Sequence, residues 1–211
     1  MSAQKSAPEI RVPSQQRSRE RVDSILEAAR VLIMEKGSSG LKIQEIAAQA
    51  GVTAGSMYQY FPNKSAILQA LAEQYFEQFH LLVRQSIPEG AVDLEDGIKL
   101  MHSLLDQFFE MNCKDPVLRD IWLSISADKT MRDMDLQTSQ RNSELLFETL
   151  KHLFAEPDWP DVKRYFLLVV NITPSAIRLA LSSEPEECPK ILEVARKMIT
   201  ASLVDRANSQ Q

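Results

Sequence analysis

The run of residues from Leu41 to Leu68 constrains the fold most, because it holds two short helical patterns separated by a tight turn. In the first pattern, apolar and small residues recur at helical spacing up to Ala50. Gly51 then ends this helix, because glycine enters the left-handed conformation without steric cost. Thr53 offers a side-chain oxygen that can cap the second helix. A third helix follows Asn63, which can cap it in the same way.

The spacing of these signals predicts a helix-turn-helix. Ala47 is small enough for the second helix to cross close above the first. The second helix is anchored by inward-facing Met57 and Phe61. Its outward face carries side chains that are small or form hydrogen bonds: Thr53, Ala54, Gly55, Ser56, Tyr58 and Gln59. No acidic residue occurs between residues 46 and 68, so DNA phosphates would not repel this face. The pattern predicts DNA binding, and a helical hairpin with a merely polar face is the alternative.

The distribution of charge agrees with a DNA-binding N-terminus. The whole chain carries a net charge of −5, which by itself is unusual for a protein that binds DNA. Residues 1–65, however, contain nine Lys and Arg against six Asp and Glu, a net charge of +3. The remaining residues, 66–211, contain fifteen against twenty-three, a net charge of −8. A basic head on an acidic body would orient the molecule toward a nucleic-acid duplex.

The same run resembles a known family, the TetR-type transcriptional regulators. The resemblance rests on the pattern Ile46-Ala47-x-x-Ala50-Gly51-Val52-Thr53-x-Gly55-x-x-Tyr58-x-Tyr60-Phe61-x-x-Lys64-x-x-x-Leu68. The earlier segment Arg21-x-x-x-Ile25-Leu26-x-Ala28-Ala29 and Gly37 resemble the first helix of that family. One departure is Lys42, where the family often has a threonine that caps the helix. We expect another residue, such as Ser39, to supply that cap.

The resemblance implies which residues touch DNA. Together with the outward face of the second helix, it gives this expected DNA-binding set: Lys42, Thr53, Ala54, Gly55, Ser56, Tyr58, Gln59, Tyr60 and Lys64. Thr53 lies at a helix start, where backbone N–H groups favour phosphate, and Lys64 would bind phosphate by its charge. Ser56 and Gln59 have side chains that can read base edges. For Tyr60, a core ring with a solvated hydroxyl is an equal alternative.

The rest of the chain predicts an all-α fold of about nine helices. Periodic apolar residues place further helices near residues 19–36, 64–87, 94–112, 129–154, 158–182 and 189–206, and Asp115-Pro116 begins another. We expect a disordered arm over residues 1–17 and a helix-turn-helix domain over 18–64. A long fourth helix would join it to a helical ligand-binding and dimerisation domain over 65–211. Whether basic residues of the arm (Lys5, Arg11, Arg17) and Arg19 contact DNA is left open.

The resemblance also implies a homodimer on double-stranded DNA. TetR-type proteins dimerise through their last two helices, which correspond to residues 158–182 and 189–206, and these segments are suitably apolar. A two-fold symmetric dimer requires a palindromic or nearly palindromic operator. The expected function is that of a ligand-responsive repressor. An activator, and a helical adaptor or ligand-binding dimer without DNA binding, are the alternatives.

The middle helices are expected to enclose a small, largely apolar effector. A mostly apolar cavity with a few polar groups is the usual form of a small-molecule site. The candidates are the methionine, aromatic and polar residues of these helices, with one leucine: Met101, His102, Leu105, Phe108, Trp122, Met134, Phe147, Tyr165 and Asn171. For each of them taken singly, an ordinary core residue is the favoured alternative. The expected mechanism is a population shift, in which effector binding disfavours the conformation that fits the operator.

The sequence lacks the motifs that are typical of other functional classes. No catalytic motif such as G-x-S-x-G, HExxH or CxxC occurs, so we expect no enzyme, no catalytic residue and no cofactor. Cys113 and Cys188 are far apart in sequence and the three histidines are scattered, so no metal site is expected; a redox switch is the less favoured reading of the cysteines. We also expect no transmembrane helix and no secretion signal. The family resemblance implies a cytoplasmic location.

Overall fold

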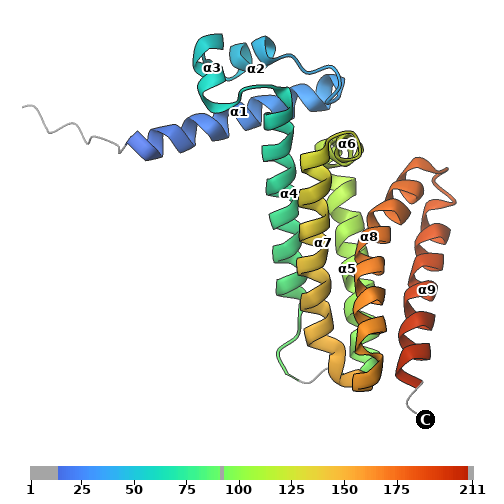
Figure 1. Cartoon of the computed structure of the whole chain (residues 1–211). Coiled ribbons are helices and arrows are strands. Elements are labelled where there is room, and N and C mark those ends of the chain that lie inside the picture. The colour runs from blue at the N-terminus through green and yellow to red at the C-terminus, as the bar shows by residue number, and fades with distance from the viewer. Residues whose placement is uncertain (1–13, 91–92, 209–211) are drawn as a thin grey trace, which may run out of the picture. The chain divides into compact units, whose positions relative to one another are not determined.

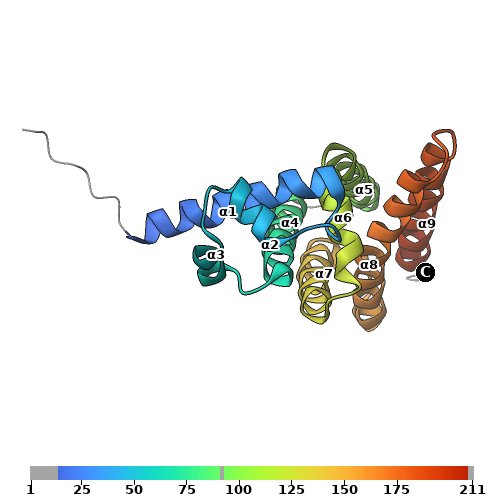
Figure 2. The same cartoon turned by 90° about the horizontal axis from the view of Figure 1, so that it is seen from above.

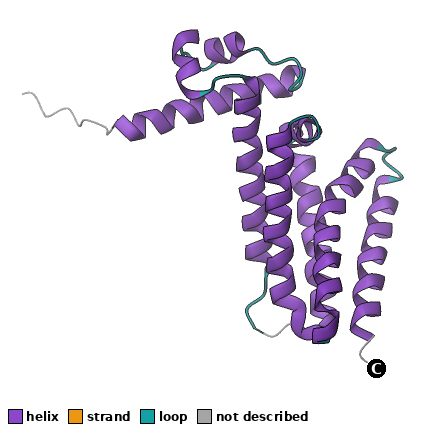
Figure 3. Ribbon diagram, viewed as in Figure 1, coloured by secondary structure: helices purple, strands orange, loops and turns teal. Residues whose placement is uncertain are grey.

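The computed structural model describes residues 14–90 and 93–208, and every regular element in these ranges is a helix (Figures 1 and 3). Nine α-helices and two short 3-10 helices follow one another along the described chain. This confirms the predicted all-α fold. The chain divides into two compact units after Ile67, inside α4, whereas the sequence placed the domain boundary after residue 64. The two units are described separately below.

The first unit contains three helices and the start of a fourth. These are α1 (Ser14–Lys36), α2 (Ile43–Gln49), α3 (Ala54–Tyr60) and the beginning of α4 (Lys64–Ser86). Its core is made of aliphatic, methionine and phenylalanine side chains that are almost fully buried: Ile25, Leu26, Ala29, Ile33, Leu41, Ile46, Ala47, Met57, Phe61 and Ile67. The inward face predicted for the helix-turn-helix is therefore the one that packs.

The beginning of α1 corrects the predicted arm. The disordered arm was expected to reach residue 17, but α1 already begins at Ser14. Gln16 Nε2 donates to Glu20 Oε1 at 3.2 Å, one helical turn further on, and this contact supports the early start. Because residues 14–18 include no helix breaker, the helix can begin at Ser14. The rest of the expected arm, residues 1–13, lies outside the described residues.

The turn between α2 and α3 has the predicted geometry. Gly51 adopts a positive φ of 65°, which is the left-handed conformation that favours glycine. The backbone N–H of Val52 then bonds to the carbonyl of Ala47 at 2.9 Å, which closes the turn. The Thr53 hydroxyl accepts from the backbone N–H of Ser56 at 3.1 Å and so caps α3. At α2 the N-cap residue is Lys42, whose side chain makes no capping hydrogen bond.

The second unit is a helical bundle. After the rest of α4 it contains α5 (Leu94–Lys114), α6 (Pro116–Ile125), α7 (Lys129–Leu150), α8 (Trp159–Ser182) and α9 (Cys188–Asn208), with 3-10 turns at Lys151–Leu153 and Glu156–Asp158. Helix α8 packs against α7 on one side and α9 on the other, and α5 also packs against α9 (Figures 1 and 2). Aspartates cap three of these helices: Asp93 for α5, Asp115 for α6 and Asp128 for α7.

Helix α8 is unusually apolar for a helix of a compact unit. By length and composition the segment Glu156–Ser182 qualifies as a candidate membrane span, with a mean hydropathy of 1.4 in its most apolar window, although the sequence analysis predicted none. Its position between α7 and α9 gives part of this apolarity a packing role. Only 33% of that window is buried within the chain, however. The helix therefore presents apolar surface that the described fold does not cover.

Candidate functional site

The predicted DNA-binding residues come together on α3 and its cap. Thr53, Ala54, Gly55, Tyr58 and Gln59 are exposed, and Ser56 and Tyr60 are half-buried. The helix is held from below by Met57, which is fully buried, and by Phe61, which is 6% exposed. This arrangement presents small and hydrogen-bonding side chains on one surface, which we call the α3 surface. The half-buried position of Tyr60 fits both of its predicted readings.

Gly55 leaves unused space on the α3 surface. A Cβ atom built at this position would meet no atom within 4 Å, and the residue does not have a positive φ. The packing of the first unit therefore gives no reason for a glycine here. A glycine inside a helix is less favourable than alanine by about 1 kcal/mol. A close approach by something outside the chain would explain why this cost is tolerated.

Lys64 has a structural partner as well as a predicted DNA role. Its ammonium donates to the backbone carbonyls of Ser38 at 3.4 Å and Ser39 at 3.2 Å, so it ties the start of α4 to the loop that follows α1. An ammonium has three N–H donors, which leaves one for a phosphate. Nearby, the Glu45 carboxylate is hydrogen-bonded to Lys36, and this contact lowers the pKa of Glu45. Lys42 is exposed at the start of α2.

Three of the residues predicted to bind an effector pack in the core of the second unit. Met101 is 4% exposed, Phe108 1% and Phe147 2%. The ring of Phe108 lies 4.4 Å from that of Phe79, measured between centroids, and Phe147 packs edge-on against Trp159. These side chains line neither of the two hollows of this unit described below. Their helical periodicity reflects close packing between helices.

Three other candidates also lie away from both hollows. His102 Nε2 lies 2.9 Å from Thr200 Oγ1 and 3.2 Å from the Arg196 carbonyl, so this side chain ties α5 to α9. The side-chain amide of Asn171 donates to the carbonyl of Leu167 at 2.7 Å, within α8 itself. The polar group of Asn171 thus has a partner in the backbone of its own helix. Met134 is half-buried on α7.

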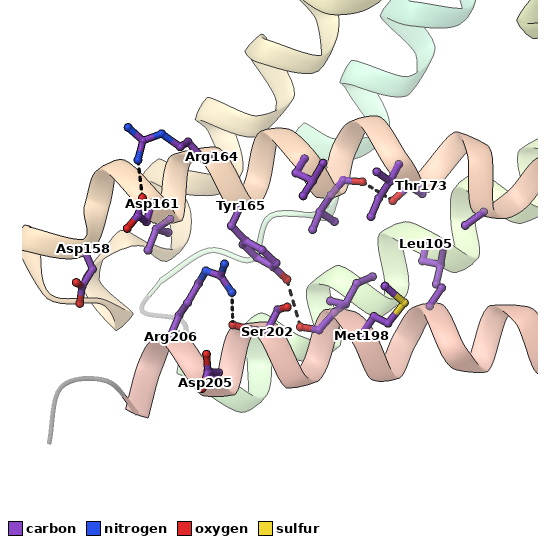
Figure 4. Close-up of a pocket in the computed structure, with 17 residues that line it drawn as sticks. Leu105, Asp158, Asp161, Arg164, Tyr165, Thr173, Met198, Ser202, Asp205 and Arg206 are labelled. Carbon is purple, nitrogen blue, oxygen red and sulfur yellow. Dashed lines mark hydrogen bonds and ion pairs between the residues drawn. The ribbon is translucent and has the colours of Figure 1, made fainter.

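The larger hollow is an open groove of about 600 Å³ between α8 and α9 (Figure 4). Two predicted effector residues line it, Leu105 and Tyr165. The Tyr165 hydroxyl donates to the Ile199 carbonyl at 3.2 Å, and the guanidinium of Arg206 lies 4.6 Å from the ring centroid. Burial raises the pKa of Tyr165, while Arg206 acts in the opposite direction. The hydroxyl is thus neutral and already engaged within the chain.

Exposed apolar side chains gather along this groove and beside it. Large hydrophobic residues of α8 and α9 are between 43% and 59% exposed, and together they form what we call the α8–α9 face: Leu168, Ile172, Leu179, Val194 and Met198. Charged residues of both signs stand at one end of the groove, including Asp161, Arg164, Asp205 and Arg206. An apolar strip with charges of both signs at its edge is typical of a surface that pairs with another protein surface.

The smaller hollow, of about 150 Å³, lies between α5, α6 and α8. We call it the Trp122 hollow, and its lining residues are Asn112, Arg119, Trp122, Leu123, Pro174, Arg178, Leu181 and Ser182. Trp122 is the one predicted effector residue in it. The sequence analysis missed Arg119 and Arg178. A signal for Arg178 was available, because no carboxylate stands three or four residues from it along the helix.

Comparison with known proteins identifies the family. Residues 96–207 match the family described as "Tetracyclin repressor-like, C-terminal domain", and residues 25–71 match "Bacterial regulatory proteins, tetR family". The chain belongs to the TetR family. It is a DNA-binding transcriptional regulator, and the second match covers the helix-turn-helix from which the sequence analysis started.

Individual TetR-family proteins differ in how much of the chain they resemble. The regulator TtgR of Pseudomonas putida is 36% identical to this chain over 85 residues. The matched region makes up 40% of this chain and 39% of the length of TtgR. The regulator BetI of Escherichia coli is 26% identical over 89% of this chain and 94% of its own. A crystal structure of a TetR-family regulator from Streptomyces coelicolor is 28% identical, with a TM-score of 0.68, and covers 88% of this chain and 99% of its own.

Proposed function

We propose that this TetR-family regulator is a repressor that binds a palindromic operator as a homodimer and releases it when a small effector binds. The observation that carries the DNA-binding part is the α3 surface, which is exposed, free of carboxylates and held by the buried Met57. Carboxylate-free surfaces with amide and hydroxyl groups suit the major groove, where base edges present donors and acceptors. The net charge of +3 over residues 1–65 favours the same partner.

Some residues of the α3 surface would contact DNA phosphates, and others would contact base edges. Thr53, Tyr58 and Tyr60, together with Lys42 and Lys64, carry hydroxyl or ammonium groups that suit phosphate oxygens. Ser56 and Gln59 have the side chains that suit base edges. Ala54 and Gly55 would let the helix approach the groove closely. This surface belongs to the domain proposed for residues 18–64.

The α8–α9 face is the proposed dimer interface. It exposes five large apolar side chains from two adjacent helices, and a monomer in water rarely leaves such a strip uncovered. A second copy would pair the same face with itself, as two-fold symmetry requires. The groove between α8 and α9 would then be filled by the partner rather than by an effector. Operator half-sites are expected about 34–36 Å apart, or a further turn, as for other symmetric helix-turn-helix dimers.

Effector control would rest on the domain proposed for residues 65–211. An effector that binds one conformation of the dimer more tightly than another shifts the population toward it. Release from the operator requires only that the favoured conformation fits DNA poorly. We place the protein in the cytoplasm, where the bacterial chromosome is. An activator would use the same contacts with the opposite effect on transcription.

The experiment that tests this function is operator selection. Purified protein is bound to a randomised duplex library at low salt, and the retained DNA is sequenced. We expect enrichment of a two-fold symmetric motif and a dimer in analytical ultracentrifugation. A folded dimer that enriches no sequence would contradict the proposal and favour an adaptor without DNA binding. Transcription from a promoter that carries the motif then separates a repressor from an activator.

A further inference from the structure

Two arginines from different helices line the Trp122 hollow. Arg119 comes from α6 and Arg178 from α8, and neither forms an ion pair with a residue that the structure describes. The hydrogen bond of Arg178 is to the Ser175 hydroxyl, at 3.0 Å. Some other arginines of the second unit are paired, since Arg141 pairs with Glu77 and Arg196 with Asp106.

Asp115 and Asp120 are the carboxylates nearest to Arg119 in sequence, and Asp115 is already engaged in other hydrogen bonds. Asp115 stands four residues earlier, but its Oδ1 accepts the backbone N–H groups of Val117 and Leu118, which caps the helix. Its Oδ2 accepts the hydroxyl of Tyr75 at 2.5 Å. Arg178 has no carboxylate at helical spacing at all. A pair of unmatched guanidinium groups is the arrangement that best recognises a carboxylate or a phosphate.

Besides the two arginines, the hollow is lined by the polar residues Asn112 and Ser182 and by a set of apolar side chains. Leu123, Pro174 and Leu181 line it together with the ring of Trp122. That ring is held edge-on by Phe76 at 5.6 Å and Phe108 at 6.0 Å, measured between centroids. A volume of about 150 Å³ is small, but an apolar cavity of about that size accommodates a benzene ring. A bulky phosphorylated compound would not fit without rearrangement.

Trp122 adds a hydrogen-bond donor without a partner. Its indole N–H is buried and has no acceptor within the described residues. Buried donors of this kind are uncommon and are usually satisfied by some partner. An oxygen atom of a bound ligand would be a candidate acceptor. The two arginines, the indole N–H of Trp122 and the apolar lining residues together favour a ligand that has an anionic oxygen and an apolar body.

We propose that the Trp122 hollow binds a small organic carboxylate whose apolar body is about the size of a benzene ring. Arg119 and Arg178 would hold the carboxylate, and Trp122, Pro174 and Leu181 would surround the apolar body. This replaces the expectation of a largely apolar effector. That the carboxylate acts as the effector rests on the proposed function, whereas its binding does not.

The position of Arg178 links this site to the proposed dimer interface. The next residue, Leu179, is 59% exposed on the α8–α9 face. A carboxylate bound by Arg119 and Arg178 joins α6 to this turn of α8. Bound ligand and partner subunit therefore act on adjacent residues of one helix. Ligand binding would therefore act directly on the part of α8 that lies at the proposed dimer interface.

Tryptophan fluorescence offers a direct binding assay. The chain contains two tryptophans, so a Trp159→Phe background leaves Trp122 as the only one. We would titrate this full-length protein, without DNA, with benzoate, phenylacetate, butyrate, and with benzyl alcohol as a neutral analogue of the same size. We expect saturable binding of at least one aromatic acid, and at least tenfold weaker binding of benzyl alcohol. Equal binding of benzoate and benzyl alcohol, or no binding of any of the acids, would overturn the proposal.

Variants of the two arginines complete the test. Arg119→Gln and Arg178→Gln should each weaken carboxylate binding at least tenfold while leaving that of benzyl alcohol unchanged. Arg84→Gln is the matched control, because it makes the same change at an exposed position on α4 and should have no effect. Since Arg178 is exposed, Arg178→Gln should fold even if Arg119→Gln does not. Unchanged carboxylate binding in folded Arg178→Gln protein would overturn the inference.

Operator binding is measured separately, so the two proposals can fail independently. If the protein selects a symmetric operator but binds no carboxylate, the inference fails and the proposed DNA-binding function stands. If it binds carboxylate but selects no operator, the proposed function fails and the site stands. If both bindings occur, the carboxylate should weaken operator binding at least tenfold at saturation. No effect on operator binding would remove its role as the effector.

Discussion

Two exposed surfaces of this protein have opposite chemistry. The α3 surface carries one large side chain of mixed character, Tyr58, which is 52% exposed, among small and amide-bearing residues. Its apolar anchor, Met57, is fully buried. The α8–α9 face instead leaves Leu168 58% and Met198 59% exposed. The first surface therefore keeps its apolar groups inside, and the second presents them to the outside.

This difference indicates which kind of partner each surface fits. Burial of apolar area stabilises a contact by about 25 cal/mol per Å², so the α8–α9 face gains most from another apolar surface. The α3 surface offers little apolar area, and its contacts would be hydrogen bonds and charge interactions with a polyanion. Those contacts weaken strongly with added salt, whereas apolar contacts do not. The predictions that follow separate the two surfaces.

The largest effect is expected from placing charges on the α8–α9 face. Leu168→Asp combined with Met198→Asp should convert the dimer to a monomer, because unpaired carboxylates would be buried at the interface. Operator affinity should then fall by about a hundredfold or more, since one head makes only half of the contacts. Analytical ultracentrifugation and fluorescence anisotropy measure the two effects. Leu136→Asp, at a residue that is 47% exposed on α7, should change neither. A double variant that remains dimeric would refute the proposed interface.

A smaller effect is expected at the cap of α3. Thr53→Ala removes the hydrogen bond to the Ser56 N–H and should destabilise the helix by about 1 kcal/mol. Operator affinity should fall by about fivefold or more, while the protein remains dimeric. Thr53→Ser keeps the oxygen and should retain most of the affinity, as measured by the same anisotropy assay. Equal losses in the alanine and serine variants would show that the hydroxyl is not what matters.

Gly55→Ala should change stability and DNA binding in opposite directions. Alanine is favoured in a helix by about 1 kcal/mol or slightly less, and the added Cβ meets nothing within 4 Å. Thermal unfolding should therefore shift upward by a few degrees. Operator affinity should fall a few-fold, because the methyl group occupies the space proposed for the DNA. A variant that is stabilised and binds the operator normally would show that the space has no role in recognition.

The smallest effect is expected at Asp135 on α7, far in sequence from the α3 surface. Burial raises the pKa of Asp135 above its ordinary 3.8, so the ionised form destabilises the folded state at neutral pH. Asp135→Asn should increase the free energy of unfolding in urea at about pH 7. The gain should shrink as the pH falls through the raised pKa toward 3.8, because the wild-type group is then protonated. Operator affinity should not change, and a gain that is independent of pH would contradict this cause.

The sequence by itself determined the first unit and the fold class. Its signals are local: Gly51 turns the chain within one residue, and Thr53 caps a helix that begins directly after it. Ala47 and Met57 are buried, as their helical spacing predicts. The same local rules predicted most helices of the second unit. In both units the ends of helices, such as the start of α1 at Ser14, did not follow from the sequence, because weak contacts decide how far a helix extends.

Only the tertiary structure decided which residues of the second unit face a hollow. Helical periodicity identifies the apolar side of a helix but not what packs against it, so it could not show that Phe108 and Phe147 are buried away from both hollows. Arg119 and Arg178 belong to separate helices, and nothing local to α6 or α8 brings them together. The packing of α5, α6 and α8 creates the space between them. A binding site built from several helices depends on contacts that are distant in sequence, which the periodicity of one helix cannot encode.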